Sequence, residues 1–228
     1  MSIQLKTTSL PDAVYEALRE SIVLLHDEPG TVLTETAVAV RYGVARPTAK
    51  AALERLVNEG FLRREAHRAA RVPELTRDDI EDLYASRALI EVAALGNLAT
   101  IREVPEGAGS AHRELLDIVR AGRPGFARAD MTFHRALVVG QHSPRLTRMH
   151  ALIMGEIELC IGQVQVRQLL RASEIAEQHQ GILDAVEGGH VELARTLTKH
   201  HIEMSRDRLL AKYDADRADG SVPAGAPV

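Results

Sequence analysis

From Thr76 to about residue 213, apolar residues recur three and four positions apart, and no segment alternates apolar and polar residues as a half-buried strand does. Helices of ordinary length arranged in this way can enclose a hydrophobic core, so we expect an all-α six-helix bundle. Turn-forming segments interrupt the pattern at 104–110, 121–125, 141–144 and 187–189. The predicted helices span 77–100, 108–121, 124–140, 144–162, 171–187 and 190–212.

The segment before this bundle has a different order of elements. A helix is expected from Pro11, a short second helix from Thr34 to Gly43, and a third helix that begins around Pro47 and ends at Gly60. Two short strands are expected at 61–62 and 70–72, around a polar tip. This order is typical of a winged helix-turn-helix, a fold that places one helix in the major groove of DNA. The fold class is therefore mainly α, with an N-terminal winged helix-turn-helix.

A domain boundary is predicted near Pro73, which ends the second strand of the wing. Thr76 followed by Asp79 resembles a capping box, so a new helix begins just after the boundary. We therefore predict three parts, listed here with their expected roles: a DNA-binding domain over 1–73, a helical-bundle effector domain over 74–213, and a disordered tail over 214–228.

Charge is placed unevenly along the chain. The net charge of the whole sequence is -4, but residues 41–71 hold eight basic and three acidic side chains. A basic segment on an acidic chain suggests a local contact with a polyanion, although charge alone favours a solvated face. The position of some of these basic residues on the third helix favours contact with DNA, because the first turns of such a helix meet base edges and phosphates. The candidate DNA-binding residues are Arg46, Thr48 and Lys50 on this helix, and His67 and Arg68 at the tip of the wing.

Several classes of protein are excluded or disfavoured by composition. Cys160 is the only cysteine, so neither an intrachain disulfide nor a cysteine-based zinc cluster can form. No apolar run approaches the ~20 residues of a membrane span, and the N-terminus lacks the apolar core of a signal peptide. We expect a cytoplasmic protein without a membrane partner.

Four polar residues interrupt apolar helical stripes and form a candidate metal site. Asp130 and His134 lie four residues apart, hence on one helix face, where both can reach one ion. His179 and His201 flank a turn at residues 188–189, which places them ~14 and ~18 Å from that turn at ~1.5 Å per residue. The two imidazoles can thus meet inside the bundle, and Asp130 with His134 can complete the site.

These residues also permit plainer interpretations. A histidine on an apolar stripe is more often a satisfied core residue than a ligand, and Asp130 with His134 can form a buried hydrogen-bonded pair. His200 competes with His201, because it too lies on an apolar stripe. Three further histidines near turns or outer faces are expected at the surface: His142, His150 and His190.

Arg87 interrupts the apolar stripe of the first bundle helix, with Glu91 one turn later. An internal ion pair between Arg87 and Glu91 explains this position in structural terms. In the functional alternative, the guanidinium faces a cavity and binds a carboxylate ligand through two hydrogen bonds.

The chain resembles a known family of regulators. Residues 28–72 resemble the DNA-binding domain of GntR-type transcriptional regulators, above all in the segment GVARPTAKAAL at 43–53. The remainder resembles the FCD effector domain of the FadR-like subfamily in three segments. These are LYASRALIEVAAL at 83–95, DMTFH at 130–134 and HQGILDAVEGGHVELARTLTKHH at 179–201. Six effector-domain helices resemble the shorter, VanR-type variant.

The resemblance implies several functional features. It carries the family's metal ligands onto Asp130, His134, His179 and His201, and its 22-residue offset favours His201 over His200. It also implies a homodimer, a palindromic operator in double-stranded DNA and a small organic-acid effector near the ion, with Arg87 facing the effector. The donor set suits Zn²⁺, Ni²⁺ or Mn²⁺.

Departures from the family pattern concern the DNA-reading part. Ala45 stands where a Ser or Thr usually caps the recognition helix, and Ala69 replaces the usual glycine of the wing. Ala49, Lys50 and Ala51 replace Val, Arg and Glu. These changes bear on operator sequence and affinity more than on the fold, and the ligand set is intact.

The sequence therefore predicts a transcriptional regulator, more often a repressor in this family, whose DNA binding responds to a carboxylate effector bound near a divalent metal ion. No enzymatic activity is expected, since no general base lies beside the site. The alternatives are a direct metal sensor, a regulator with a purely structural ion that responds to a partner protein, and a metal-dependent hydrolase.

Overall fold

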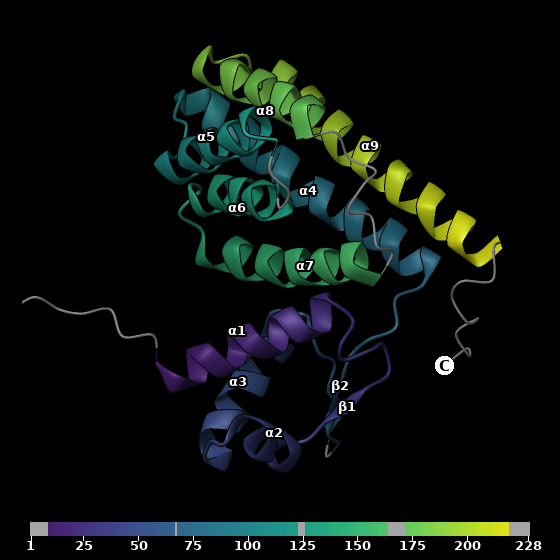
Figure 1. The fold of residues 1–228 in the computed structure, drawn as a ribbon. Helices are drawn as coiled ribbons and strands as arrows, with labels where there is room; N and C mark the ends of the chain where they lie inside the picture. Colours follow the sequence, from purple (N-terminus) through teal and green to yellow (C-terminus); the bar gives the residue numbers. More distant parts are fainter. Residues whose placement is uncertain (1–8, 67, 123–125, 164–171, 219–228) are drawn as a thin grey trace, which may run out of the picture. The chain divides into compact units, whose positions relative to one another are not determined.

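The computed structural model describes residues 9–66, 68–122, 126–163 and 172–218 (Figure 1). The chain divides into two compact units, Met1–Glu74 and Leu75–Val228. The described part of the first unit contains three helices and a two-stranded sheet, in the order α1 (Leu10–Val23), β1 (Val32–Leu33), α2 (Glu35–Tyr42), α3 (Arg46–Asn58) and β2 (Ala70–Arg71).

The helices of the first unit begin and end at the expected signals. Thr34 caps α2 by accepting a hydrogen bond from the Ala37 amide, and Gly43 ends this helix in the left-handed conformation, at φ +63°. In α3, by contrast, the N-cap is Ala45, which provides no side-chain hydrogen bond. This uncapped start is the structural consequence of the departure seen in the sequence.

The prediction of a strand at 61–62 is wrong. Phe61 and Leu62 are almost fully buried, and both of their amides donate to the carbonyl of Leu56 at the end of α3. Those amides are therefore unavailable to a sheet ladder. Instead, β2 pairs antiparallel with β1, a strand that the sequence pattern does not predict, and a single bridge joins Arg63 to Arg71 on the other side.

The second unit confirms the predicted all-α bundle within the described residues. α4 packs against α6, α7, α8 and α9 and is the central helix (Figure 1). Thr76 and Asp79 form the expected capping box at its start. The helices of the unit are α4 (Arg77–Ile101), α5 (Glu106–Arg120), α6 (Phe126–Val139), α7 (Pro144–Gln163), α8 (Ala172–Glu187) and α9 (Val191–Ala218).

The prediction that the disordered tail begins at 214 is wrong for its first five residues. α9 continues to Ala218, because contacts one turn apart support its end. Lys212 pairs with Asp216, and Arg217 contacts the hydroxyl of Tyr213. The rest of the predicted tail, residues 219–228, lies outside the described residues. So do residues 124–125 of the helix expected at 124–140 and residue 171 of the helix expected at 171–187.

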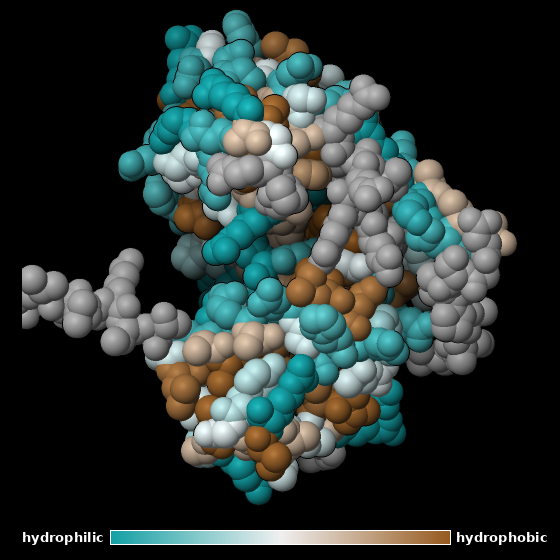
Figure 2. Space-filling model, viewed as in Figure 1, coloured by the Kyte–Doolittle hydropathy of each residue, from teal (hydrophilic) through white to brown (hydrophobic). Residues whose placement is uncertain are grey.

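The hydrophobic core of the second unit surrounds α4. Leu95 and Leu98 of α4 pack with Phe133 of α6 and Ile182 of α8, all of them buried. The visible surface is mixed, with hydrophilic and hydrophobic residues interspersed (Figure 2). Among the helices described, none has the length and apolar character that crossing a membrane requires. The core therefore ties α4, α6 and α8 into one framework, and the candidate site lies within it.

Candidate metal centre and nucleic-acid interface

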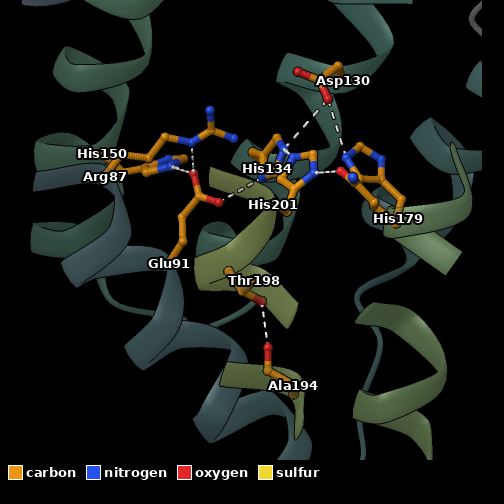
Figure 3. A network of polar contacts seen from close by, with 10 residues as sticks. Arg87, Glu91, Asp130, His134, His150, His179, Ala194, Thr198 and His201 are labelled. Atoms are coloured by element: carbon orange, nitrogen blue, oxygen red, sulfur yellow. Dashed lines mark hydrogen bonds and ion pairs between the residues drawn. The ribbon is translucent and has the colours of Figure 1, made fainter. Parts of the chain in front are cut away.

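Three helices bring the four candidate ligands together. Asp130 and His134 come from α6, His179 from α8 and His201 from α9, and the side chains converge in the interior of the bundle (Figure 3). One potential ligand atom from each residue lies within 4.8 Å of all the others. The three histidines are buried, whereas the side chain of Asp130 is 15% exposed.

The turn between α8 and α9 makes this convergence possible. Gly189 adopts a φ of +73°, which reverses the chain between the two helices at low cost for a residue without a Cβ. His179 and His201 then face each other, with ring centroids 4.9 Å apart. His200 is exposed, so the structure places His201, and not His200, toward the other ligands.

Three separations between candidate ligand atoms are close to those of neighbouring ligands of one ion. His134 Nε2 lies 3.1 Å from His201 Nε2, and Asp130 Oδ1 lies 3.3 Å from His179 Nε2 and 3.6 Å from His134 Nε2. Ligands bonded at about 2.1 Å to one divalent ion lie roughly 3 Å or slightly more apart. The donor set fits a first-row divalent cation.

Unsatisfied polar atoms support the same fit. Asp130 Oδ1 and both ring nitrogens of His179 are buried and have no hydrogen-bond partner among the described residues. Leaving buried polar atoms unpaired is costly, and such atoms in a cluster indicate an ion or water that is not part of the polypeptide.

Hydrogen bonds on the far side of two rings strengthen this conclusion. His134 Nδ1 lies 2.7 Å from Glu91 Oε2, and His201 Nδ1 lies 2.7 Å from Gln178 Oε1. Both partners are acceptors, so each Nδ1 carries the proton and each Nε2 of a neutral ring carries a lone pair. Two lone pairs 3.1 Å apart repel each other unless a cation, either a proton or a metal ion, lies beside them.

Burial controls the protonation of the ligands. It lowers the pKa of His179 to about 4, although Asp130 opposes this effect. Burial, followed by repulsion from His134, also holds the pKa of His201 well below its usual value. Burial opposes the ionisation of Asp130 as well, but contacts with His134 and His179 hold the pKa of this carboxyl well below its usual range. At neutral pH, two neutral imidazoles therefore face an ionised carboxylate.

His134 differs from the other two histidines. Burial and the charge of Arg87 both disfavour its protonated form, but Glu91 and Asp130 outweigh them and raise the pKa of His134. A cation beside His134 is therefore favoured by its surroundings, whether that cation is a proton or a metal ion.

Arg87 forms the ion pair expected from the sequence, while its binding of a carboxylate effector stays a prediction. Its Nε donates to Glu91 Oε1 at 2.8 Å, which is the expected internal ion pair. Its Nη2, however, is buried without a hydrogen-bond partner among the described residues, so one donor remains available to a ligand. Arg87 is only 2% exposed, and its guanidinium lies 5.8 Å from the ring centroid of Tyr84.

Three residues that line the site are not predicted to do so by the sequence. The sequence pattern predicts for Glu91 only the ion pair with Arg87, and it indicates no role for Gln178. The prediction that His150 is a surface residue is wrong: it is buried on α7, and its Nε2 lies 2.8 Å from Glu91 Oε1. A signal was present, because His150 lies four residues before Met154 and seven before Ile157, on their buried stripe. His142 and His190 are exposed, as predicted.

The predicted DNA-binding residues lie at the start of α3 and in the wing. Arg46 and Lys50 are exposed and make only loose ion pairs, at 3.6 Å to Glu35 and 3.7 Å to Glu54. Thr48 is partly buried within the first turn of the helix. Exposed basic side chains without close partners are available to phosphates and base edges.

Of the two residues at the tip of the wing that are predicted to contact DNA, the structure describes one. Arg68 is exposed and pairs with Glu65 at 2.9 Å, an exposed contact that contributes little to stability and can exchange for a phosphate. His67, which is also predicted to contact DNA, lies outside the described residues.

Comparison with protein families assigns both parts of the chain. Residues 10–72 match the model described as "Bacterial regulatory proteins, gntR family", and residues 82–204 match the FCD domain. The second match covers more than half of the chain. It contains all four candidate metal ligands, whereas the first contains the described DNA-contact candidates Arg46, Thr48, Lys50 and Arg68.

Related proteins are named as regulators. A protein from Paenarthrobacter nicotinovorans named "Probable D-xylose utilization operon transcriptional repressor" is 26% identical over 176 residues, which cover 76% of each chain. BphR of Paraburkholderia xenovorans, an HTH-type transcriptional regulator, is 27% identical over 206 residues, covering 86% of this chain and 84% of BphR.

Solved structures show the same fold. A GntR transcriptional regulator from Rhodococcus sp. RHA1 superposes with a TM-score of 0.72 at 23% identity, covering 88% of this chain and 97% of that one. McbR/YncC of E. coli superposes with a TM-score of 0.67 at 19% identity, covering 91% of this chain and all of its own. At these identities, the likeness is one of fold alone.

Proposed function

This chain belongs to the GntR family of bacterial regulatory proteins and carries an FCD domain, and on that basis we propose how its regulation works. Like its family and its relatives, it is a DNA-binding transcriptional regulator and not an enzyme. We propose that it is a repressor, and that a small carboxylate effector controls its operator binding from a site beside a divalent metal ion. The proposed ligands of that ion are Asp130, His134, His179 and His201.

DNA contact is proposed for the exposed residues of α3 and the wing. Arg46 and Lys50 would meet base edges and phosphates, with Thr48 beside them and Arg68 and His67 on the wing. We propose that two copies form a homodimer, since a two-fold symmetric protein matches a palindromic operator. A protein that regulates transcription in this way acts in the cytoplasm.

One observation carries the proposal of the metal ion: two imidazole lone pairs 3.1 Å apart, with an ionised carboxylate and a third unpaired imidazole beside them. A proton can occupy the space between two rings, but it cannot satisfy His179 and Asp130 as well. One carboxylate and three imidazoles suit Zn²⁺, Ni²⁺ or Mn²⁺. When bound, such an ion supplies a Lewis acid with a coordination position that an effector carboxylate can fill.

Arg87 provides the second anchor for a carboxylate. Its unpaired Nη2 is a buried donor, and a carboxylate that accepts this hydrogen bond gains a charge-assisted contact. Because Nε remains paired with Glu91, the guanidinium is held in a fixed orientation for the effector. Effector binding then shifts the equilibrium of the dimer between a DNA-binding and a released geometry. The free energy of this shift cannot exceed the difference in effector binding free energy between the two states.

The test measures DNA release directly. Fluorescence anisotropy with operator fragments selected from random DNA is recorded for metal-free protein, for Zn²⁺-loaded protein, and for Zn²⁺-loaded protein with a panel of small mono- and dicarboxylic acids. We expect at least one acid to weaken DNA binding of the loaded protein only. His134→Ala/His179→Ala should bind DNA without responding to the acid, whereas His200→Ala, which alters an exposed neighbour of His201, should respond as wild type does. A response that is the same without metal would contradict the proposal.

A direct metal sensor is the second candidate. The close pairing of Arg87 with Glu91 and the almost complete burial of Arg87 favour it, because they leave the guanidinium partly satisfied without an effector. In the same assay, release of DNA on addition of Zn²⁺, Ni²⁺ or Mn²⁺ alone would identify this mechanism.

A further inference from the structure

Glu91 lies at the centre of a buried network behind the proposed metal ligands. This α4 residue is 0% exposed, and its two carboxylate oxygens divide their contacts. Oε2 faces His134 Nδ1 at 2.7 Å, whereas Oε1 accepts hydrogen bonds from Arg87 Nε and His150 Nε2, both at 2.8 Å (Figure 3). Three donors from three helices thus fix one carboxylate.

The contact with His134 determines which ring nitrogen carries the proton. An ionised carboxylate can only accept, so His134 Nδ1 must donate. The lone pair of a neutral His134 then lies on Nε2, the atom 3.6 Å from Asp130 Oδ1 and 3.1 Å from His201 Nε2. In the opposite tautomer, an N–H group would point at the other ligands and could not bind a cation.

The other two histidines of the site lack an equivalent carboxylate among the described residues. His201 Nδ1 faces the neutral amide oxygen of Gln178 at 2.7 Å, and His179 Nδ1 has no hydrogen-bond partner among the described residues. A charged acceptor orients a ring more strongly than an amide does, and it also makes the ligating nitrogen more basic. Among the partners described, Glu91 is therefore the strongest orienting group behind the three histidine ligands.

Arg87 and His150 hold Glu91 in place for this task. Burying a carboxylate without partners is prohibitive, but the guanidinium compensates its charge and the two donors saturate Oε1. With Oε1 occupied, Oε2 is left to His134. His150 thus acts on the metal centre through Glu91, without touching any of the four ligands in the contacts described.

We propose that Glu91 is a positioning residue of the metal centre, which fixes the Nδ1–H tautomer of His134 and so presents Nε2 to the ion, and that Arg87 and His150 fix Glu91. This role deepens the proposed function and rests on its metal centre. The chemistry is that of a carboxylate–histidine–metal triad, in which the outer partner commonly changes metal affinity by 10- to 100-fold.

The first test reads the tautomer without metal. Histidine ring nitrogens of chelator-treated protein are observed by ¹⁵N NMR at a pH above the pKa of His134, for wild type and for Glu91→Gln. An amide offers one acceptor oxygen where the carboxylate offers two, so the variant must give up either the donors at Oε1 or the bond to His134. We expect His134 to be protonated at Nδ1 in wild type and at Nε2, or at a mixture of both, in the variant. An unchanged tautomer would overturn the proposal.

The second test measures the dissociation constant of Zn²⁺ by competition with a chromogenic chelator. Glu91→Gln should weaken binding by about 10- to 100-fold. Because the single variant leaves the buried charge of Arg87 unpaired, Arg87→Leu/Glu91→Gln removes both charges and tests the same contact in a neutral interior. It should show the same loss. His150→Phe, which removes one donor to Glu91 Oε1, should show a smaller loss.

The matched control is Thr198→Val. Thr198 is buried on α9, three residues before His201, and its hydroxyl donates only within the helix, to the carbonyl of Ala194 at 2.8 Å (Figure 3). This variant should bind Zn²⁺ within about twofold of wild type. If Arg87→Leu/Glu91→Gln also stays within that range, Glu91 has no positioning role. A wild-type protein that binds no Zn²⁺ would refute the metal centre itself, and the role of Glu91 with it.

Discussion

Removing the metal should make the second unit sensitive to mild acid, and His179 should account for a measurable share of that sensitivity. Burial lowers the pKa of its imidazole to about 4, whereas an unfolded chain restores the ordinary value near 6.5. As pH falls through this interval, the unfolded state takes up a proton that the folded state excludes, so the free energy of unfolding decreases. Stability is retained above about pH 6.5 and is lost toward pH 4.

The magnitude follows from the width of the interval. Between about pH 7.5 and about pH 4.5, a shift of this size costs about 2–3 kcal/mol. His179 is fully buried, so solvent does not screen the effect. His134, with its raised pKa, changes stability in the opposite sense, but it is present in wild type and variant alike.

The assay is hydrogen exchange in α8 of the chelator-treated protein at these two pH values, corrected for the pH dependence of intrinsic exchange. His179→Phe removes the titrating group and keeps a ring stacked on Phe133, whose centroid lies 3.8 Å from that of His179. The variant should lose about 2–3 kcal/mol less than wild type on acidification. His200→Gln, at an exposed position, is the control and should behave as wild type. Equal losses in wild type and His179→Phe would refute the reasoning.

Three further predictions concern DNA and effector. Ala45→Ser should cap α3 through the Thr48 amide, as Thr34 caps α2, and slow exchange in α3 by an amount equivalent to about 1 kcal/mol; no slowing, or equal slowing in Ala45→Val, would contradict this. DNA affinity should fall with a log–log salt slope of about 0.9 per phosphate contacted, and Lys50→Gln should reduce the slope by about one contact; a flat salt dependence would exclude phosphate contacts. Arg87→Gln should weaken effector binding, as measured by calorimetry; an unchanged affinity for the effector would mean that Arg87 serves only the ion pair with Glu91.

Helix periodicity and caps could be predicted because they are local. The stripe of Ile80, Leu83 and Tyr84 on α4 is buried as expected, and Thr76 caps this helix as its sequence indicates. The convergence of His179 and His201 also followed from local rules, because a two-glycine turn joins helices that must pack antiparallel.

Features that depend on distant partners could not be predicted. The pairing of β2 with β1 joins segments almost forty residues apart, and local propensity favoured 61–62 instead, where burial against α3 prevailed. The polar composition after residue 213 predicts a disordered tail. The end of α9 is nevertheless helical, because side-chain contacts one turn apart support it.

The network around Glu91 shows the same limit. Its contacts to His134 and His150 span 43 and 59 positions of the sequence, so only the ion pair to Arg87, four residues away, could be expected. The turn before His150 favours a surface position for this residue, although its place on the buried stripe is visible in the sequence. The four candidate ligands could be named because each interrupts an apolar stripe and because the family resemblance favours His201 over His200, but the groups that orient them could not be predicted.

Metal content is the most direct measure of the central claim. The protein is purified from medium supplemented with Zn²⁺, Ni²⁺ and Mn²⁺, dialysed, and analysed for bound metals together with His134→Ala/His179→Ala and His200→Ala. We predict close to one divalent ion per chain in wild type and in His200→Ala, and almost none in the double variant. Full occupancy in the double variant, or a wild-type protein without stoichiometric metal, would contradict a metal centre built from Asp130, His134, His179 and His201.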